Sequence, residues 1–172
     1  MAELRIKLTD LAAPLRKAES TLKAAIVVSA AAVLSQSAGD RAANAAAAHG
    51  HFDDFAALLP ALRGGMVPVA LLSRPAGTDE IEIDAARLDT SMATISTRQG
   101  SAEQALRDVI ARQTRDDIDV LAQRIGHLGR AFQHLASLVT GETDDTPFRF
   151  DQFFREAMQD LAQRDWSATD GA

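Results

Sequence analysis

The chain has 172 residues, no cysteine and a formal net charge of −6 at pH 7, so it has the length of one domain that can bury its own core. The missing thiols exclude disulfides, thiolate zinc sites and a cysteine nucleophile, and the acidic balance argues against nucleic acid, which requires clustered Lys and Arg. Hydrophobic residues reach 47%, much of it alanine, while aromatic residues make up only 5%, which favours closely packed helices.

The N-terminal segment 3–8 reads ELRIKL, whose alternation of apolar and charged residues predicts a half-buried strand. A helix is predicted over 14–37, with an apolar stripe that includes Leu22 and Ile26. Its apolar run, 24–34, is too short to span a bilayer, and the acidic residues before it are atypical of a signal peptide. We therefore expect a buried helix in a cytoplasmic protein that does not interact with membranes, with residues 1–23 retained.

Two short helices and a hairpin are expected next. The alanine-rich segment 40–48 predicts one short helix that ends before Gly50, and 53–62 predicts another. Segments 66–73 and 80–84 read as strands that pair as a hairpin over 66–84, with 3–8 as a third strand. Because Pro68 lies in the first of these runs, that strand is either an edge strand or is broken at Pro68. The segment 90–100 is rich in Ser and Thr and is interpreted as a loop or a weak strand.

The C-terminal part predicts a helical hairpin formed by 101–140 and 147–165. Ser101 and Gln104 match a capping box, and a polar stretch predicts a break near Thr114. A heptad seam then runs through Ile118, Leu121, Ile125, Leu128, Phe132, Leu135 and Val139. The sequence thus predicts a mostly α, single-domain protein over 1–172, a helical bundle with long helices and a small two- or three-stranded sheet.

The order of elements in the first half has a loose likeness to a known group of proteins. A short strand over 3–8, a long alanine-rich helix and a small hairpin look like bacteriophage tail-completion and minor tail proteins. This resemblance covers only the first half of the chain and rests on no residue motif. It implies a structural role in an assembly.

One candidate metal site combines His49, His51, Asp53 and Asp54. Imidazole and carboxylate groups together suit zinc, iron or manganese. The pattern resembles the His-x-His-x-Asp element of binuclear metallohydrolases, but the strand that precedes it in those enzymes and their downstream ligands are missing here. The alternative is structural, with His49 at a helix C-terminus and Asp53 or Asp54 capping the next helix.

A second candidate site lies on the outer side of the heptad seam, where His127 and His134 are seven residues apart with Arg130 between them. The segment RIGHLGRAFQHLASL resembles the histidine box of bacterial histidine kinases and phosphotransfer domains. The resemblance implies an exposed His127 that accepts a phosphoryl group beside a cation. The acidic residue that often follows this histidine is replaced by Leu128. The alternative is a solvated histidine on a polar helix face.

The absence of nucleophile-elbow, phosphate-loop and dinucleotide motifs favours a protein that is not an enzyme and needs no cofactor. The function expected from sequence is that of a non-catalytic assembly or interaction protein with protein partners. A homo-oligomer is predicted because short neighbouring helices and a small sheet offer little cover for Leu15, Leu22, Ile26 and Val33. A phosphotransfer module using His127 and a small metal-dependent enzyme using the His49–Asp54 cluster are the alternatives.

Overall fold

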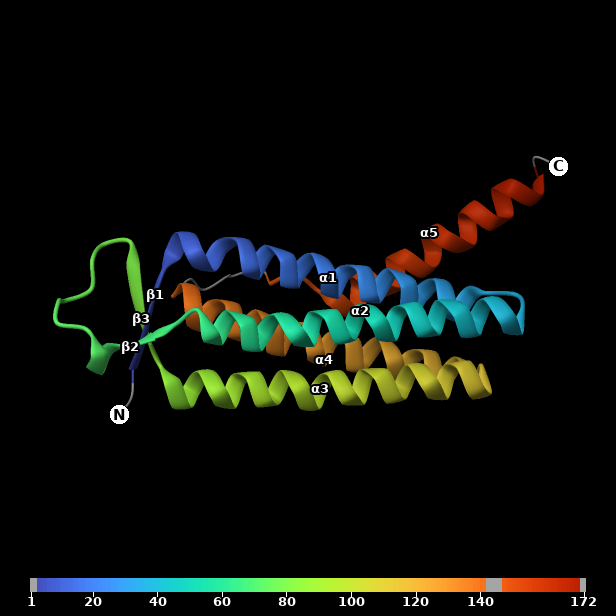
Figure 1. Cartoon of the computed structure of the whole chain (residues 1–172). Coiled ribbons are helices and arrows are strands. Elements are labelled where there is room, and N and C mark those ends of the chain that lie inside the picture. The colour runs from blue at the N-terminus through green and yellow to red at the C-terminus, as the bar shows by residue number, and fades with distance from the viewer. Residues whose placement is uncertain (1–2, 142–146, 171–172) are drawn as a thin grey trace.

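A computed structural model of the chain describes residues 3–141 and 147–170, with only the backbone for 164–170. Within these residues, long α-helices form a bundle with a small antiparallel sheet at one end (Figure 1). The predicted class, mostly α with a small sheet, is confirmed. No helix in the described part of the chain combines the length and the apolar character that crossing a membrane would require.

The bundle consists of two antiparallel helical hairpins. The first joins α1 (Leu8–Leu34) to α2 (Ala38–Gly64), and the second joins α3 (Ala85–Arg112) to α4 (Arg115–Thr140). Each turn is short and locally capped: the Ser37 hydroxyl accepts from the Asp40 N–H at 3.0 Å, and Thr114 accepts from the Asp117 N–H at 3.1 Å. Gln113, with φ of 55°, reverses the chain between α3 and α4. The predicted break near Thr114 is confirmed.

The core lies along the axis of the bundle, where apolar positions from all four helices meet. Phe55 of α2 and Phe132 of α4 contact each other edge to face, with ring centroids 5.5 Å apart, and so link the two hairpins. The predicted seam is confirmed as core, because six of its members are buried and Ile118 packs against the core. Leu22 and Ile26 are fully buried within the chain.

The sheet has the order β2-β1-β3, with β1 (Glu3–Lys7) between β2 (Val67–Pro68) and β3 (Glu80–Asp84). The hairpin predicted over 66–84 is therefore wrong, since both of its strands pair with β1 and not with each other. Pro68 does lie on an edge strand, as predicted. A short 3-10 turn, η1 (Val69–Leu71), follows β2, and β3 leads directly into α3.

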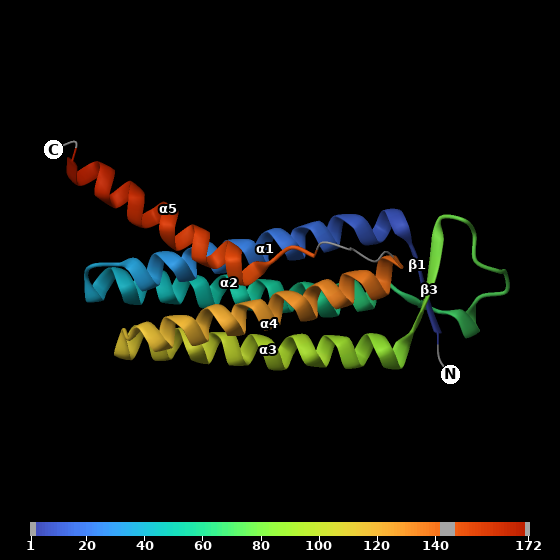
Figure 2. The same ribbon diagram turned by 180° about the vertical axis from the view of Figure 1, so that it is seen from behind.

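The last helix, α5 (Phe150–Asp170), packs against α1 and α4 near its start and then diverges from the bundle (Figures 1 and 2). Phe150 and Phe154 are its buried anchors. The predicted hairpin partner of 101–140, over 147–165, thus exists, but it begins three residues later and is shared between α1 and α4.

Two helix predictions in the first half need correction. The first helix starts at Leu8, six residues before the predicted 14–37, because β1 passes directly into it, and it ends at Leu34. The two short helices over 40–48 and 53–62 are one continuous α2. Its buried face includes Ala48, Phe52 and Phe55, which bridge the expected gap. Burying each phenyl ring contributes roughly 1.5–3 kcal/mol, which outweighs the cost of about 1 kcal/mol for Gly50 inside a helix.

The loop or weak strand predicted for 90–100 is also wrong, since this segment belongs to α3. The capping-box assignment of Ser101 fails for the same reason; the helix starts at Ala85, where the Asp84 carboxylate accepts from the Ala86 N–H at 2.8 Å. Buried positions recur every three or four residues along α3. They are Leu88, Ser91, Ile95, Gln99, Ala102, Ala105, Leu106 and Val109. Packing of this face overrides the weak helix propensity of the Ser- and Thr-rich segment.

Candidate functional site: a cationic groove between α3 and α4

A groove of about 560 Å³ lies between α3 and α4, in the half of this hairpin nearer the sheet. Figure 2 shows the two helices lying side by side along this face. From α3 the groove is lined by Ala86, Arg87, Thr90, Ser91, Thr94 and Arg98. From α4 it is lined by His127, Arg130, Ala131, His134 and Leu138. Among the described residues, its ionisable lining consists of three arginines and two histidines, with no carboxylate, in a protein whose net charge is −6.

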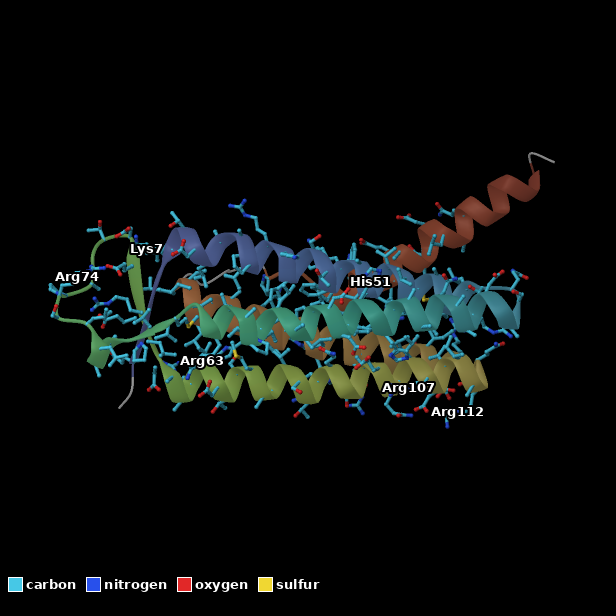
Figure 3. The ribbon with its side chains drawn as sticks, viewed as in Figure 1. Lys7, His51, Arg63, Arg74, Arg107 and Arg112 are labelled. Carbon is cyan, nitrogen blue, oxygen red and sulfur yellow. The ribbon has the colours of Figure 1, made fainter. Side chains whose placement is uncertain are left out.

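The three arginine side chains of the groove are unpaired. Arg87, Arg98 and Arg130 are exposed, and among the described residues their guanidinium groups form no hydrogen bond or ion pair; the one bond at Arg87 is that of its backbone N–H to Asp84 Oδ1. Several arginines outside the groove are paired, among them two that Figure 3 labels. Arg63 pairs with Asp89 at 3.1 Å, and Arg74 with Glu80 at 2.6 Å. The guanidinium groups of the groove thus keep their donors available.

Ser91 places a hydroxyl without a partner at the groove. The residue is 7% exposed, and its Oγ is buried with no hydrogen bond. A buried serine in a helix usually donates to the carbonyl four residues earlier, as Ser29 does to Ala25 O at 2.7 Å. Thr94, one turn further along α3, does the same to Thr90 O at 3.0 Å. Ser91 is an exception, and an unsatisfied buried hydroxyl carries a free-energy cost.

His127 lies opposite α3 and is half-buried, so the prediction of an exposed imidazole is wrong. Its Nδ1 is buried and has no hydrogen-bond partner. Burial lowers the pKa of His127 below its ordinary value, and the positive charges of Arg130, Arg98 and Arg124 lower it further. The imidazole is therefore neutral at pH 7, with one nitrogen able to donate and one able to accept.

The two glycines that flank His127 serve a different contact. A Cβ on Gly129 would overlap the ring of Phe150 in α5, and one on Gly126 would lie 3.1 Å from Asp151 Cβ. These glycines let α5 cross α4 closely. The group that approaches α4 here is the chain's own last helix, on another side of α4 from the groove.

The candidate metal cluster is dispersed by the continuous helix α2. His49 and His51 are two residues apart, which places them about 200° apart around a helix. His49 Nδ1 lies 2.9 Å from Glu103 Oε1 of α3, while His51 lies midway along α2 (Figure 3). Asp53 and Asp54 are exposed and cap no helix start, since α2 runs through them. Among the described residues, no group of three or more His, Asp or Glu side chains could hold a metal ion.

The structure brings His127, Arg130 and His134 together, as the sequence predicted, but the α3 side of the groove was missed. Arg87, Ser91, Thr94 and Arg98 follow steps of four, three and four residues. This spacing places the four residues on one face of a helix, and it is the signal from which the α3 side of the groove could have been predicted. The interpretation of 90–100 as a loop or a weak strand concealed it.

The chain was compared with known proteins, and no protein-family model, no curated protein and no solved structure matches it. The resemblances to phage tail proteins, metallohydrolases and histidine-box proteins gain no support from these comparisons.

Proposed function

We propose that the chain is a non-catalytic interaction protein that binds an anionic partner in the groove between α3 and α4. The observation that carries the proposal is the set of three unpaired arginines, Arg87, Arg98 and Arg130, in a groove whose described lining holds no carboxylate. Guanidinium groups recognise carboxylates and phosphates through paired N–H donors. Because the protein is acidic overall, a local cationic groove selects the face on which an anion docks.

The apolar stripe from which the sequence predicted a homo-oligomer is covered at Leu22 and Ile26 within the chain itself. Leu22 and Ile26 were expected to need a second copy, but the other helices of the same chain cover them completely. The continuous α2 and the crossing α5 supply the bulk that the sequence interpretation lacked. The anionic partner is therefore proposed on the charge of the groove and not on an uncovered apolar stripe.

The test is a ¹H–¹⁵N NMR titration of the whole protein with inorganic phosphate and, separately, with a short glutamate peptide. Binding is expected to shift amide signals of α3 and α4 around Ser91 and His127. Arg98→Glu should remove the shifts. Arg107→Glu is the matched control, because Arg107 is an exposed, unpaired arginine of α3 toward the end distant from the sheet (Figure 3). Absence of any binding, or equal loss in both variants, overturns the proposal.

A second candidate function is phosphoryl transfer to His127, favoured by a neutral imidazole beside two arginines. Since Nδ1 is buried, Nε2 is the nitrogen that a donor can reach. The N–P bond would form as the P–O bond of a receiver's aspartyl phosphate breaks and its carboxylate leaves. Label from a phosphorylated receiver domain should then transfer to wild type and to His134→Ala, but not to His127→Ala. Failure of transfer to wild type ends this candidate.

A further inference from the structure

The lining of the groove points to one class of anion. We propose that the groove is a binding site for a phosphomonoester, which is a dianionic phosphate group carried on a small apolar body. This inference rests on the proposed function. Ser91, His127, Arg98 and Arg130 would hold the phosphate, and the small apolar side chains between them would contact the body.

The charge of the lining favours a dianion. Arg98 and Arg130 come from different helices, yet both lower the pKa of His127, so their positive charges act on the same part of the groove. No carboxylate in the described part of the chain lines the groove to balance them. A phosphomonoester above its second pKa, near 6, carries two negative charges and several acceptor oxygens, whereas a carboxylate or a sulfate ester carries one.

One buried hydroxyl at the groove needs a partner. Ser91 Oγ forms no hydrogen bond within the described structure, whereas the hydroxyls of Ser29 and Thr94 donate to carbonyl groups of their own helices. The Ser91 hydroxyl can donate to a phosphate oxygen, and the neutral imidazole of His127 can donate through Nε2. A bound phosphate would therefore remove the free-energy cost of the unsatisfied Ser91 hydroxyl.

The rest of the lining suits a small apolar body. Ala86, Ala131 and Leu138 are apolar, and Thr90 and Thr94 contribute methyl groups. The volume of about 560 Å³ falls within the range of roughly 300–1,000 Å³ that is typical of small-molecule sites. A groove of this composition fits a phosphate ester better than a free phosphate ion.

The experiment compares three probes by isothermal titration calorimetry at pH 8: phenyl phosphate, phenyl sulfate and the glutamate peptide. Phenyl phosphate and phenyl sulfate share their shape and differ in charge. We expect phenyl phosphate to bind about tenfold or more tightly than phenyl sulfate. Arg98→Glu and Arg130→Gln should each weaken it about 10- to 100-fold. Ser91→Ala should weaken it with no loss of folding, whereas Ser96→Ala, an exposed serine of α3, and Arg107→Glu should leave it unchanged.

The outcomes separate this inference from the proposed function. If phenyl sulfate or the glutamate peptide binds as tightly as phenyl phosphate, and Arg98→Glu still abolishes binding, the groove is a general anion site and the phosphomonoester inference is wrong. If only a phosphorylated peptide binds and phenyl phosphate does not, the small-molecule inference is also wrong. If no anion binds wild type, both proposals fail. Binding that survives Arg98→Glu and Arg130→Gln places the ligand elsewhere and overturns both.

Discussion

At the scale of single residues, Ser91 carries a buried hydroxyl that has no hydrogen-bond partner among the described residues. We predict that Ser91→Ala raises the free energy of unfolding by about 1–2 kcal/mol, because it removes an unsatisfied polar atom and introduces a better helix former. Urea denaturation measures this change. Ser96→Ala is the control, because Ser96 is exposed and its substitution changes only the helix propensity. A serine with a structural role would instead destabilise on substitution, so a lower urea midpoint for Ser91→Ala contradicts the interpretation of this hydroxyl as a ligand-binding group.

His127 supplies a second prediction at this scale, on protonation. Burial and the charges of Arg130, Arg98 and Arg124 keep the pKa of His127 below its ordinary value in the free protein. A dianion bound in the groove offsets those charges and favours the imidazolium, so it should raise this pKa. Arg98→Glu should raise it in the free protein too. NMR titration of the imidazole Cε1–H measures both effects, and an unchanged pKa on ligand binding would argue that the ligand lies away from His127.

At the scale of elements, the crossing of α4 and α5 depends on Gly129. We predict that Gly129→Ala lowers the free energy of unfolding by about 1–3 kcal/mol or more, since the added methyl group overlaps Phe150. Gly100→Ala is the matched control within α3, where a Cβ meets nothing within 4 Å. That variant should gain about 0.5–1 kcal/mol from helix propensity. If both variants change the urea midpoint in the same direction, the close approach of α5 to α4 is not what requires glycine at 129.

At the scale of the whole molecule, the two helical hairpins are joined through Phe55 and Phe132. We predict that Phe132→Ala lowers the free energy of unfolding by about 3–5 kcal/mol, because it leaves a cavity between the hairpins. Phe132→Leu should cost less, because it keeps more of the buried volume. Thermal or urea unfolding followed by circular dichroism provides the measurement. A loss below about 1 kcal/mol for the alanine variant would show that the hairpins are held together elsewhere.

Oligomeric state is a further property of the whole molecule. Because α2 and α5 cover the stripe that includes Leu22 and Ile26, we predict a monomer of 18.4 kDa in sedimentation equilibrium at micromolar concentration. A dimer under these conditions would restore the self-association expected from the sequence. It would then have to use a surface other than this stripe.

The sequence by itself determined the class of the fold, the heptad seam of α4 and the break near Thr114, because these depend on local periodicity and capping. It also placed His127, Arg130 and His134 on one face of a helix. It could not determine that 90–100 continues a helix or that α2 is unbroken, since burial against distant helices outweighs weak local propensity there.

Only the tertiary structure decided which residues of each candidate site come together. The pairing of β1 between β2 and β3 depends on contacts more than 60 residues apart in sequence, which no local pattern encodes. The same is true of the groove, where Ser91 and Arg98 come to face His127 only because α3 and α4 pack as an antiparallel pair. Local periodicity indicates which face of a helix is buried. It does not indicate which face of another helix packs opposite, and the groove is formed by two such faces.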